Sequence, residues 1–141
     1  MKRSASAVWR GNLKTGKGSL STDSTVLKDT QYSFTSRFES GVGTNPEELI
    51  AAAHAGCFTM ALSAGLDQAG FTAESLITTA ALTLENNPQT SWTISAIHLT
   101  TVAKVPNISP EKFAEVAAGA KANCPVSRVL KAAITLDAKL T

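Results

Sequence analysis

The chain has 141 residues, a length typical of one domain and sufficient to bury a hydrophobic core, so we expect a single domain over residues 1–141. Thirteen basic residues against eleven acidic ones leave a formal charge of +2, which argues against a nucleic-acid-binding or membrane-surface protein. Hydrophobic residues (43%) and charged residues (17%) exclude a disordered chain, and two cysteines exclude a disulfide-rich secreted scaffold.

Short strands are predicted in the first forty residues. Alternating side chains over residues 4–9 indicate one strand, and two more strand-like segments cover residues 16–22 and 32–38. In the third segment, Tyr32, Phe34, Ser36 and Phe38 would share one face of the strand.

A long helix is predicted next. Asn45 is a suitable cap, Pro46 suits the first helical position, and Glu47 favours the positive end of the helix dipole. Alternatively, Thr44 caps the helix and Glu47 completes a capping box. The helical pattern continues for more than twenty residues and ends before Gly70.

The second half of the chain alternates strands and helices. We expect strands at 71–84 and 92–105, a helix from Pro110 to about Asn123, a short helix after Cys124-Pro125, and a closing strand at 133–140. This order predicts an α+β fold with a mostly antiparallel sheet and two main helices.

The long helix has no wide polar face in its first turns, so it must be covered on all sides. One sheet covers only one side, and we therefore expect a second subunit to cover the other. Its His54, Thr59 and Ser63 and its many small residues favour a buried helix over a membrane span. The first ten residues lack the apolar run of a signal peptide, so we expect a cytoplasmic protein with free thiols.

Two weak motifs are better explained as ordinary structure. The segment 11–18 superficially matches a phosphate-binding loop, but Gly18 stands where Ser or Thr should bind magnesium, so a glycine-rich hairpin is expected. His54 and Cys57 share a helix face, and Cys124 could add a third metal ligand, but no paired ligand spacing exists. We therefore expect no metal site, and a partly buried, hydrogen-bonded His54.

The two cysteines allow two interpretations. Both could be small buried hydrophobic residues, which is common for free cysteine. Cys124, however, precedes Pro125 at a helix start, where backbone amides can stabilise a thiolate.

Three segments in this order resemble the OsmC/Ohr family, which comprises osmotically inducible protein C and the organic hydroperoxide resistance proteins. They are TNPEEL (44–49), AAHAGCF (52–58) and CPVSRVL (124–130), and the resemblance extends from Trp9 to the last strand. Gly16-Lys-Gly18 and the segment from Tyr32 to Glu39 resemble the OsmC branch. The Ohr branch carries its catalytic arginine in a glycine-rich N-terminal segment, which the residues around Arg10 do not reproduce, so Arg37 is the better match.

The resemblance implies a thiol-dependent peroxidase that reduces organic hydroperoxides. Cys57 would be the peroxidatic thiol and Cys124 the resolving thiol, with Arg37 and Glu47 as the polar pair at the reacting sulfur. It also implies an intertwined homodimer around a long buried central helix, with no bound cofactor. The external reductant in the family is typically a dihydrolipoyl group.

The chemistry fits these roles. A thiolate attacks the distal peroxide oxygen, the alcohol leaves, and Cys57 becomes a sulfenic acid that Cys124 converts to a disulfide. An external dithiol then reopens the disulfide by exchange. Cys57 lies three turns inside the predicted helix, so its thiolate needs a cation such as an arginine from elsewhere.

The helix side that carries Cys57 is expected to be apolar and to favour alkyl and fatty-acid hydroperoxides over hydrogen peroxide. The residues expected to form this substrate pocket are Ile50, Ala53, Phe58, Met60 and Ala61. The alternative is a non-catalytic module that binds an apolar ligand in a cavity at the dimer interface, with both thiols serving only as packing residues.

Glu47 precedes Cys57 by ten residues, which is about 15 Å along an unbroken helix. We therefore expect Glu47 to act at Cys57 of a partner subunit, where it would hold Arg37 by a bidentate hydrogen bond. The alternative is that Glu47 only favours the start of the helix through the dipole.

Overall fold

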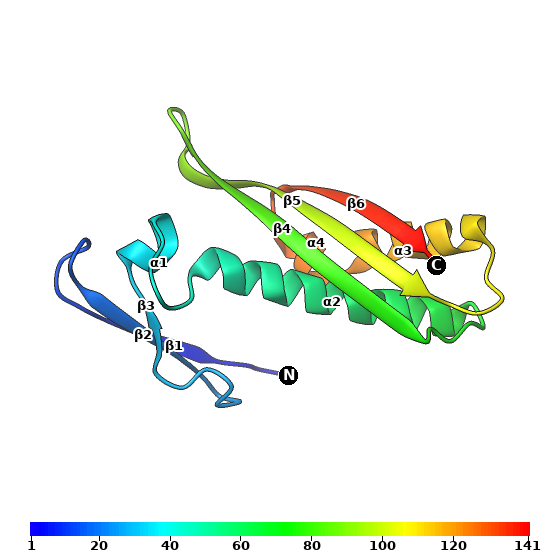
Figure 1. The fold of residues 1–141 in the computed structure, drawn as a ribbon, viewed down its shortest axis with the longest axis horizontal. Coiled ribbons are helices and arrows are strands. Elements are labelled where there is room, and N and C mark those ends of the chain that lie inside the picture. Colours follow the sequence, from blue (N-terminus) through cyan, green and yellow to red (C-terminus); the bar gives the residue numbers. More distant parts are fainter. The chain divides into compact units, whose positions relative to one another are not determined.

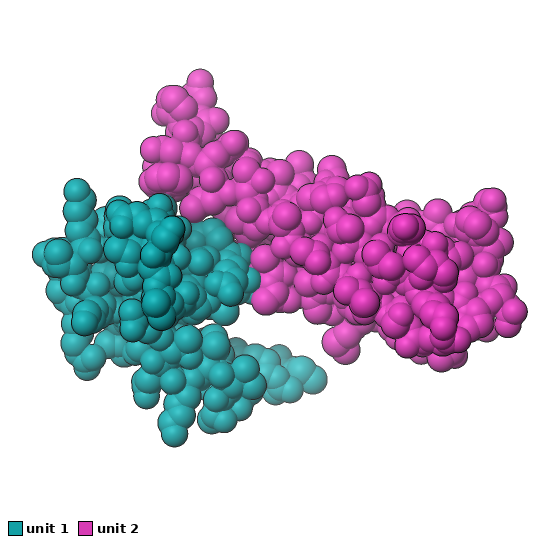
Figure 2. Space-filling view, in the orientation of Figure 1, with its two compact units in different colours: residues 1–49 teal, residues 50–141 magenta.

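The computed structural model describes all 141 residues and divides into two compact units, Met1–Leu49 and Ile50–Thr141 (Figure 2). Each unit has its own three-stranded sheet (Figure 1). The α+β class is confirmed, with two small sheets in place of the single sheet expected. Three of the four strand pairs are antiparallel, and one is parallel.

The first unit is an antiparallel meander followed by a short helix. Gly18 lies opposite Trp9 in the register and beside Tyr32, and a Cβ at this position would lie 2.3 Å from the Tyr32 ring. Only glycine lets the two aromatic rings pack, with centroids 5.4 Å apart. The glycine-rich segment is therefore a hairpin, as expected. The elements are β1 (Ala5–Arg10), β2 (Lys17–Thr22), β3 (Thr30–Tyr32) and α1 (Phe34–Phe38).

The strand predicted over residues 32–38 is wrong beyond Tyr32. Ser33 caps α1, because its hydroxyl accepts from the Ser36 amide while the Ser36 hydroxyl accepts from the Ser33 amide. This local capping box outweighs the alternating pattern. Phe34 and Phe38 then lie one helical turn apart, with ring centroids separated by 5.0 Å.

Helix α2 (Pro46–Gln68) begins and ends as the sequence predicts. The Asn45 side chain accepts a hydrogen bond from the Glu48 amide at 2.8 Å, so Asn45 rather than Thr44 is the cap. At the other end Gly70 has φ +84°, and the Phe71 amide donates back to the Leu66 carbonyl.

The second unit packs its helices against one face of its sheet (Figure 1). Alternate residues of β5, including Ile97 and Leu99, contact Phe58 and Leu62 of α2 and Phe113 of the next helix in a common core. The elements are β4 (Ser75–Asn87), β5 (Ser91–Lys104), α3 (Pro110–Asn123), α4 (Pro125–Val129) and β6 (Ala133–Leu140), in sheet order β4-β5-β6.

Two expectations about this sheet need correction. The strand predicted from residue 71 begins at Ser75, because the preceding residues complete the end of α2. Strand β6 runs parallel to β5, because the α3–α4 segment carries the chain back across the helical face before β6 begins.

The long helix is not buried on all sides within one chain. Its fully buried residues form a single stripe at intervals of four, whereas Met60 is 75% exposed. By length and composition alone α2 could cross a membrane, a test that core helices of soluble proteins also pass. The stripe consists of His54, Phe58, Leu62 and Leu66.

Candidate functional site

The two cysteines lie together in the second unit. Cys124 Sγ lies 3.0 Å from Cys57 Sγ, at hydrogen-bonding distance, although 67 residues separate them in the chain. A disulfide bond would require the sulfurs to approach by about a further 1 Å. Cys57 is partly exposed, whereas Cys124 is fully buried. The thiols are therefore placed to exchange between a dithiol and a disulfide with little movement of the backbone.

Cys124 occupies the junction of two helices. It closes α3, where its amide donates to the Ala120 carbonyl, and it immediately precedes Pro125 at the start of α4. The first free amides of α4, on Val126 and Ser127, donate to the Cys124 sulfur. The helix junction thus aims backbone donors at one thiol, as its position before Pro125 predicts.

The two thiols differ in acidity. Burial and the hydrogen bond with Cys124 raise the pKa of the Cys57 thiol above its usual value, although the Val126 amide opposes them. Burial also disfavours the Cys124 thiolate, but hydrogen bonds from Cys57, from Ser127 and from the Val126 amide outweigh it, so the pKa of Cys124 is lowered. A nearby positive charge would therefore be needed to stabilise a Cys57 thiolate.

His54 is completely buried next to the thiols, one helical turn before Cys57. Its Nε2 lies 2.8 Å from the Ser127 hydroxyl, and its Nδ1 has no hydrogen-bond partner. Desolvation lowers the pKa of the imidazole, which is therefore neutral at pH 7. The expected hydrogen bond is confirmed, but the burial is complete rather than partial. The described side chains include no group of three or more His, Cys, Asp or Glu residues placed to bind a metal.

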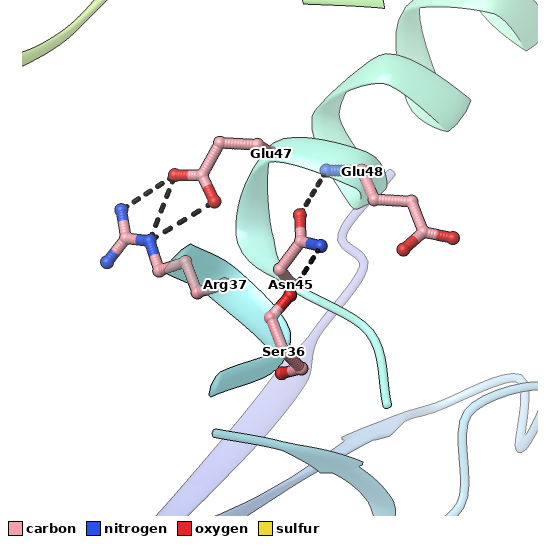
Figure 3. Close-up of polar contacts among 5 residues, drawn as sticks. All are labelled: Ser36, Arg37, Asn45, Glu47 and Glu48. Carbon is pink, nitrogen blue, oxygen red and sulfur yellow. Dashed lines mark hydrogen bonds and ion pairs between the residues drawn. The ribbon is translucent and has the colours of Figure 1, made fainter. Parts of the chain in front are cut away.

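In the first unit, Arg37 and Glu47 form a close ion pair (Figure 3). Arg37 Nη2 donates to Glu47 Oε1 at 2.6 Å, and Arg37 Nε lies 3.1 Å from both carboxylate oxygens. The predicted bidentate hydrogen bond between these side chains is confirmed. The Arg37 side chain is 36% exposed and the Glu47 side chain 13%, so Glu47 is the more buried member of the pair.

Asn45 connects the two helices that carry this pair. Its side-chain amide donates to the Ser36 carbonyl in α1, while its side-chain oxygen accepts from the Glu48 amide in α2 (Figure 3). Ser36 is itself buried and donates to the Thr44 carbonyl. These contacts fix the separation of the helices and hence the geometry of the Arg37–Glu47 pair.

An apolar pocket of about 270 Å³ lies beside Arg37, entirely within the first unit. Four aromatic rings contribute to its wall, in the Trp9–Tyr32 and Phe34–Phe38 pairs. The residues that line it are Trp9, Leu13, Tyr32, Ser33, Phe34, Arg37, Phe38 and Pro46. Sequence reasoning missed this pocket, because Tyr32, Phe34 and Phe38 were assigned to one face of a strand and Trp9 to a separate strand.

The residues expected to form a substrate pocket on α2 differ in burial and do not all face the same side of the helix. Phe58 is completely buried in the core, so it is not available to contact a substrate in this chain. Met60 is mostly exposed, as is Ala53, while Ile50 and Ala61 are partly buried. Ser127 was also missed, although its position three residues after Cys124 on a predicted helix is a signal that could have found it.

Comparison with known proteins agrees with the geometry. A family model described as OsmC-like protein matches residues 39–139. Peroxiredoxin OsmC of Escherichia coli (strain K12) is 51% identical over 134 residues, covering 95% of this chain and 93% of that protein. Peroxiredoxin OsmC of Shigella flexneri has the same identity and coverage.

Solved structures share the fold. An OsmC-like protein of unknown function from Vibrio cholerae superposes with a TM-score of 0.79 at 14% identity, over 98% of this chain and 99% of that one. The organic hydroperoxide resistance protein OhrB of Bacillus subtilis gives a TM-score of 0.68 at 23% identity, over 98% of both chains. With the family model covering most of the chain, and relatives that share half of its residues, the protein belongs to the OsmC family.

Proposed function

We propose that the protein is a thiol-dependent peroxidase that reduces organic hydroperoxides. The observation that carries this proposal is the contact between the Cys57 and Cys124 sulfurs at 3.0 Å. In a non-catalytic ligand-binding protein the two cysteines would serve only as packing residues. Such residues would not require contact between the sulfurs, partial exposure of Cys57 or hydrogen-bond donors around Cys124. The name of the Escherichia coli relative, a peroxiredoxin with 51% identity, supports the same activity.

Cys57 is the peroxidatic thiol in this proposal because it is the accessible one. A hydroperoxide can approach partly exposed Cys57, whereas Cys124 is fully buried. The Cys57 thiolate attacks the distal peroxide oxygen, the O–O bond breaks, and the alcohol leaves after taking up a proton. The Cys57 sulfenic acid then condenses with Cys124 to a disulfide, with release of water.

The positive charge that Cys57 needs is supplied by Arg37. Glu47 holds the guanidinium through two of its nitrogens, so the cation is aimed rather than free to rotate. Arginine remains protonated at every physiological pH, so it can stabilise a thiolate and a polarised peroxide together.

The arginine is proposed to act between subunits. Helix α2 is continuous from Pro46 to Gln68, and ten residues of helix separate Glu47 from Cys57, or about 15 Å along the axis. A glutamate side chain does not span that distance. A second copy of the chain, packed against the exposed apolar side of α2 around Met60, would supply both the missing cover and the missing cation.

The aromatic pocket beside Arg37 supports an organic substrate. A hydroperoxide whose polar end meets the guanidinium can place its hydrocarbon part among the rings of Trp9 and Phe34. Each buried methylene contributes about 0.8 kcal/mol, and hydrogen peroxide has none to bury. Recycling of the disulfide is assigned to an external dithiol such as a dihydrolipoyl group, and no bound cofactor is required.

Peroxide consumption with reduced lipoamide as electron donor tests the proposal. We expect turnover with cumene hydroperoxide in the wild type, none in Cys57→Ser, and a single turnover in Cys124→Ser. Titration of thiols after one equivalent of hydroperoxide should show the loss of two thiols per chain. A protein that keeps both thiols reduced while it binds the hydroperoxide would instead be a carrier.

A further inference from the structure

A line of polar groups leads from a buried histidine to the thiol pair. His54 Nε2 lies 2.8 Å from Ser127 Oγ, the Ser127 side chain hydrogen-bonds to Cys124, and Cys124 Sγ lies 3.0 Å from Cys57 Sγ. The histidine comes from α2 and the serine from α4, 73 residues later. The proposed catalytic cycle uses both thiols but assigns nothing to His54 or Ser127.

The burial of His54 is costly and is not explained by packing alone. The imidazole is fully buried, and Ser127 is its one side-chain partner, because Nδ1 has none. A buried polar atom without a partner is rare in native proteins and is often found at functional positions. An apolar residue would fill the same space in the buried stripe of α2 without this cost.

The hydrogen-bond donors can be assigned from the same contacts. For the Ser127 hydroxyl to donate to the Cys124 sulfur, its oxygen must accept from His54, so the proton of the neutral imidazole is on Nε2. Nδ1 is then a bare acceptor, and an unpaired buried acceptor is tolerated better than an unpaired buried N–H group. The neutral form agrees with the lowered pKa of His54.

We propose that His54 is a positioning residue for the resolving step, which acts through Ser127 by fixing the serine hydroxyl as a hydrogen-bond donor to the Cys124 sulfur. This inference rests on the proposed peroxidase cycle and deepens it. Without the imidazole, the hydroxyl can rotate about its C–O bond toward other acceptors. With it, the donor to Cys124 is held in one orientation before the thiolate forms.

The step that benefits is disulfide formation. The Cys124 thiol loses its proton, and the resulting thiolate attacks the sulfur of the Cys57 sulfenic acid. The S–O bond breaks, and the leaving hydroxide takes up a proton to give water, so the proton released by Cys124 balances the one consumed. The serine hydroxyl stabilises the charge on Cys124 until the S–S bond has formed.

Titration of the Cys124 thiol tests the His54–Ser127–Cys124 hydrogen bonds without requiring peroxidase activity. In a Cys57→Ser background the thiolate absorbance at 240 nm reports only Cys124. We expect Ser127→Ala and His54→Leu to raise the pKa of Cys124 to the same extent, and the double variant to raise it no further, because the two residues act in series. His54→Gln restores an N–H donor and should return the pKa toward that of the parent. His98→Gln, which removes an imidazole that contacts Thr135 and Asp137 instead of the thiols, is the matched control.

Kinetics in the chain with both cysteines provide the second readout. After one equivalent of cumene hydroperoxide, sulfenic acid formation should be unchanged in Ser127→Ala, and disulfide formation should slow roughly tenfold, the value of one charge-assisted hydrogen bond. A merely structural role for His54 would slow both steps or neither.

The inference is overturned if Ser127→Ala leaves the pKa of Cys124 and the rate of disulfide formation unchanged. It is also overturned if Ser127→Ala raises the pKa of Cys124 while folded His54→Leu leaves it unchanged. Ser127 is only partly buried, so Ser127→Ala tests the serine donor even where His54→Leu fails to fold. In that case His54→Asn tests the imidazole, because its shorter side chain does not reach Ser127, and an unchanged pKa of Cys124 in His54→Asn would overturn the inference. Failure of the proposed peroxidase function can be distinguished from failure of this inference. In the first case the wild type does not consume hydroperoxide, but the pKa of Cys124 can still be measured by titration.

Discussion

Glu47 holds Arg37 through Nε and Nη2, and the carboxylate is the more buried member of the pair. The two hydrogen bonds hold the guanidinium in one orientation against the carboxylate. Lysine carries the same charge but has a single nitrogen and cannot form the two parallel hydrogen bonds.

We therefore expect Arg37→Lys to reduce the rate of Cys57 sulfenic acid formation about a hundredfold, the typical cost of removing one oriented donor from a reacting group. Stopped-flow measurement with cumene hydroperoxide under single-turnover conditions gives this rate. Arg3→Lys, at an exposed position whose guanidinium donates only to the Lys2 carbonyl, is the matched control and should have no effect. Equal rates in Arg37→Lys and the wild type would remove the guanidinium from the reaction.

The aromatic pocket predicts a change in substrate preference. Phe34→Ala removes one ring of the pocket wall while Arg37 remains. We expect kcat/KM for cumene hydroperoxide to fall roughly tenfold, equivalent to about two buried methylenes, with little change for hydrogen peroxide. Val26→Ala, in an exposed loop at 84% exposure, is the control. A parallel loss with both peroxides would indicate damage to the fold rather than to a substrate pocket.

Action between subunits predicts complementation. Cys57→Ser and Glu47→Ala chains are each expected to be inactive, but a mixed dimer has one site with both defects and one intact site. Co-refolding equal amounts should therefore recover activity, to about a quarter of wild type if the chains pair at random and each intact site works independently. If the mixture stays as inactive as its parents, Glu47 serves the thiol of its own chain or has no catalytic role.

Burial of His54 predicts a pH dependence of stability. The unfolded imidazole binds a proton near the usual pKa of 6.5, whereas desolvation lowers the pKa in the folded chain. Below pH 6.5 the unfolded state takes up a proton that the folded state excludes, so the free energy of unfolding falls as the pH falls toward the folded pKa. Above pH 6.5 both states are neutral and the contribution is constant.

Urea denaturation of the reduced protein at pH 7.5 and 5.5 measures this difference. His54→Gln, which cannot titrate, should show a smaller fall in stability between the two pH values than the wild type does. An identical slope in His54→Gln would mean that other groups account for the loss.

Local sequence patterns predicted helix boundaries correctly where single residues within or next to the helix set them. Asn45 and Gly70 delimit α2 because a side-chain cap and a positive φ are properties of single residues. The pattern over residues 32–38 was misleading, since alternation and helical spacing both place Phe34 and Phe38 on one face. The Ser33–Ser36 capping box decided between them.

The site was only partly accessible to sequence reasoning, for a different reason. The roles of Cys57 and Cys124 were predicted from the resemblance to the OsmC/Ohr family. No local sequence pattern predicts that two residues in separate helices will be in contact. The spacing of Ser127 from Cys124 was visible in the sequence, but its contact with His54 spans 73 residues. Only the packing of α4 against α2 in three dimensions creates that contact.

The separation of 67 residues between the thiols has a consequence for the newly made chain. At roughly 5–20 residues per second, a ribosome adds Cys124 about 3–13 seconds after Cys57. During that interval Cys57 has no Cys124 thiol to capture a sulfenic acid, which further peroxide would convert irreversibly to the sulfinic and sulfonic forms. In the proposed cycle Cys57 gains its activating arginine only on assembly with a second subunit, so an unassembled chain would keep this thiol unreactive until the resolving thiol is in place.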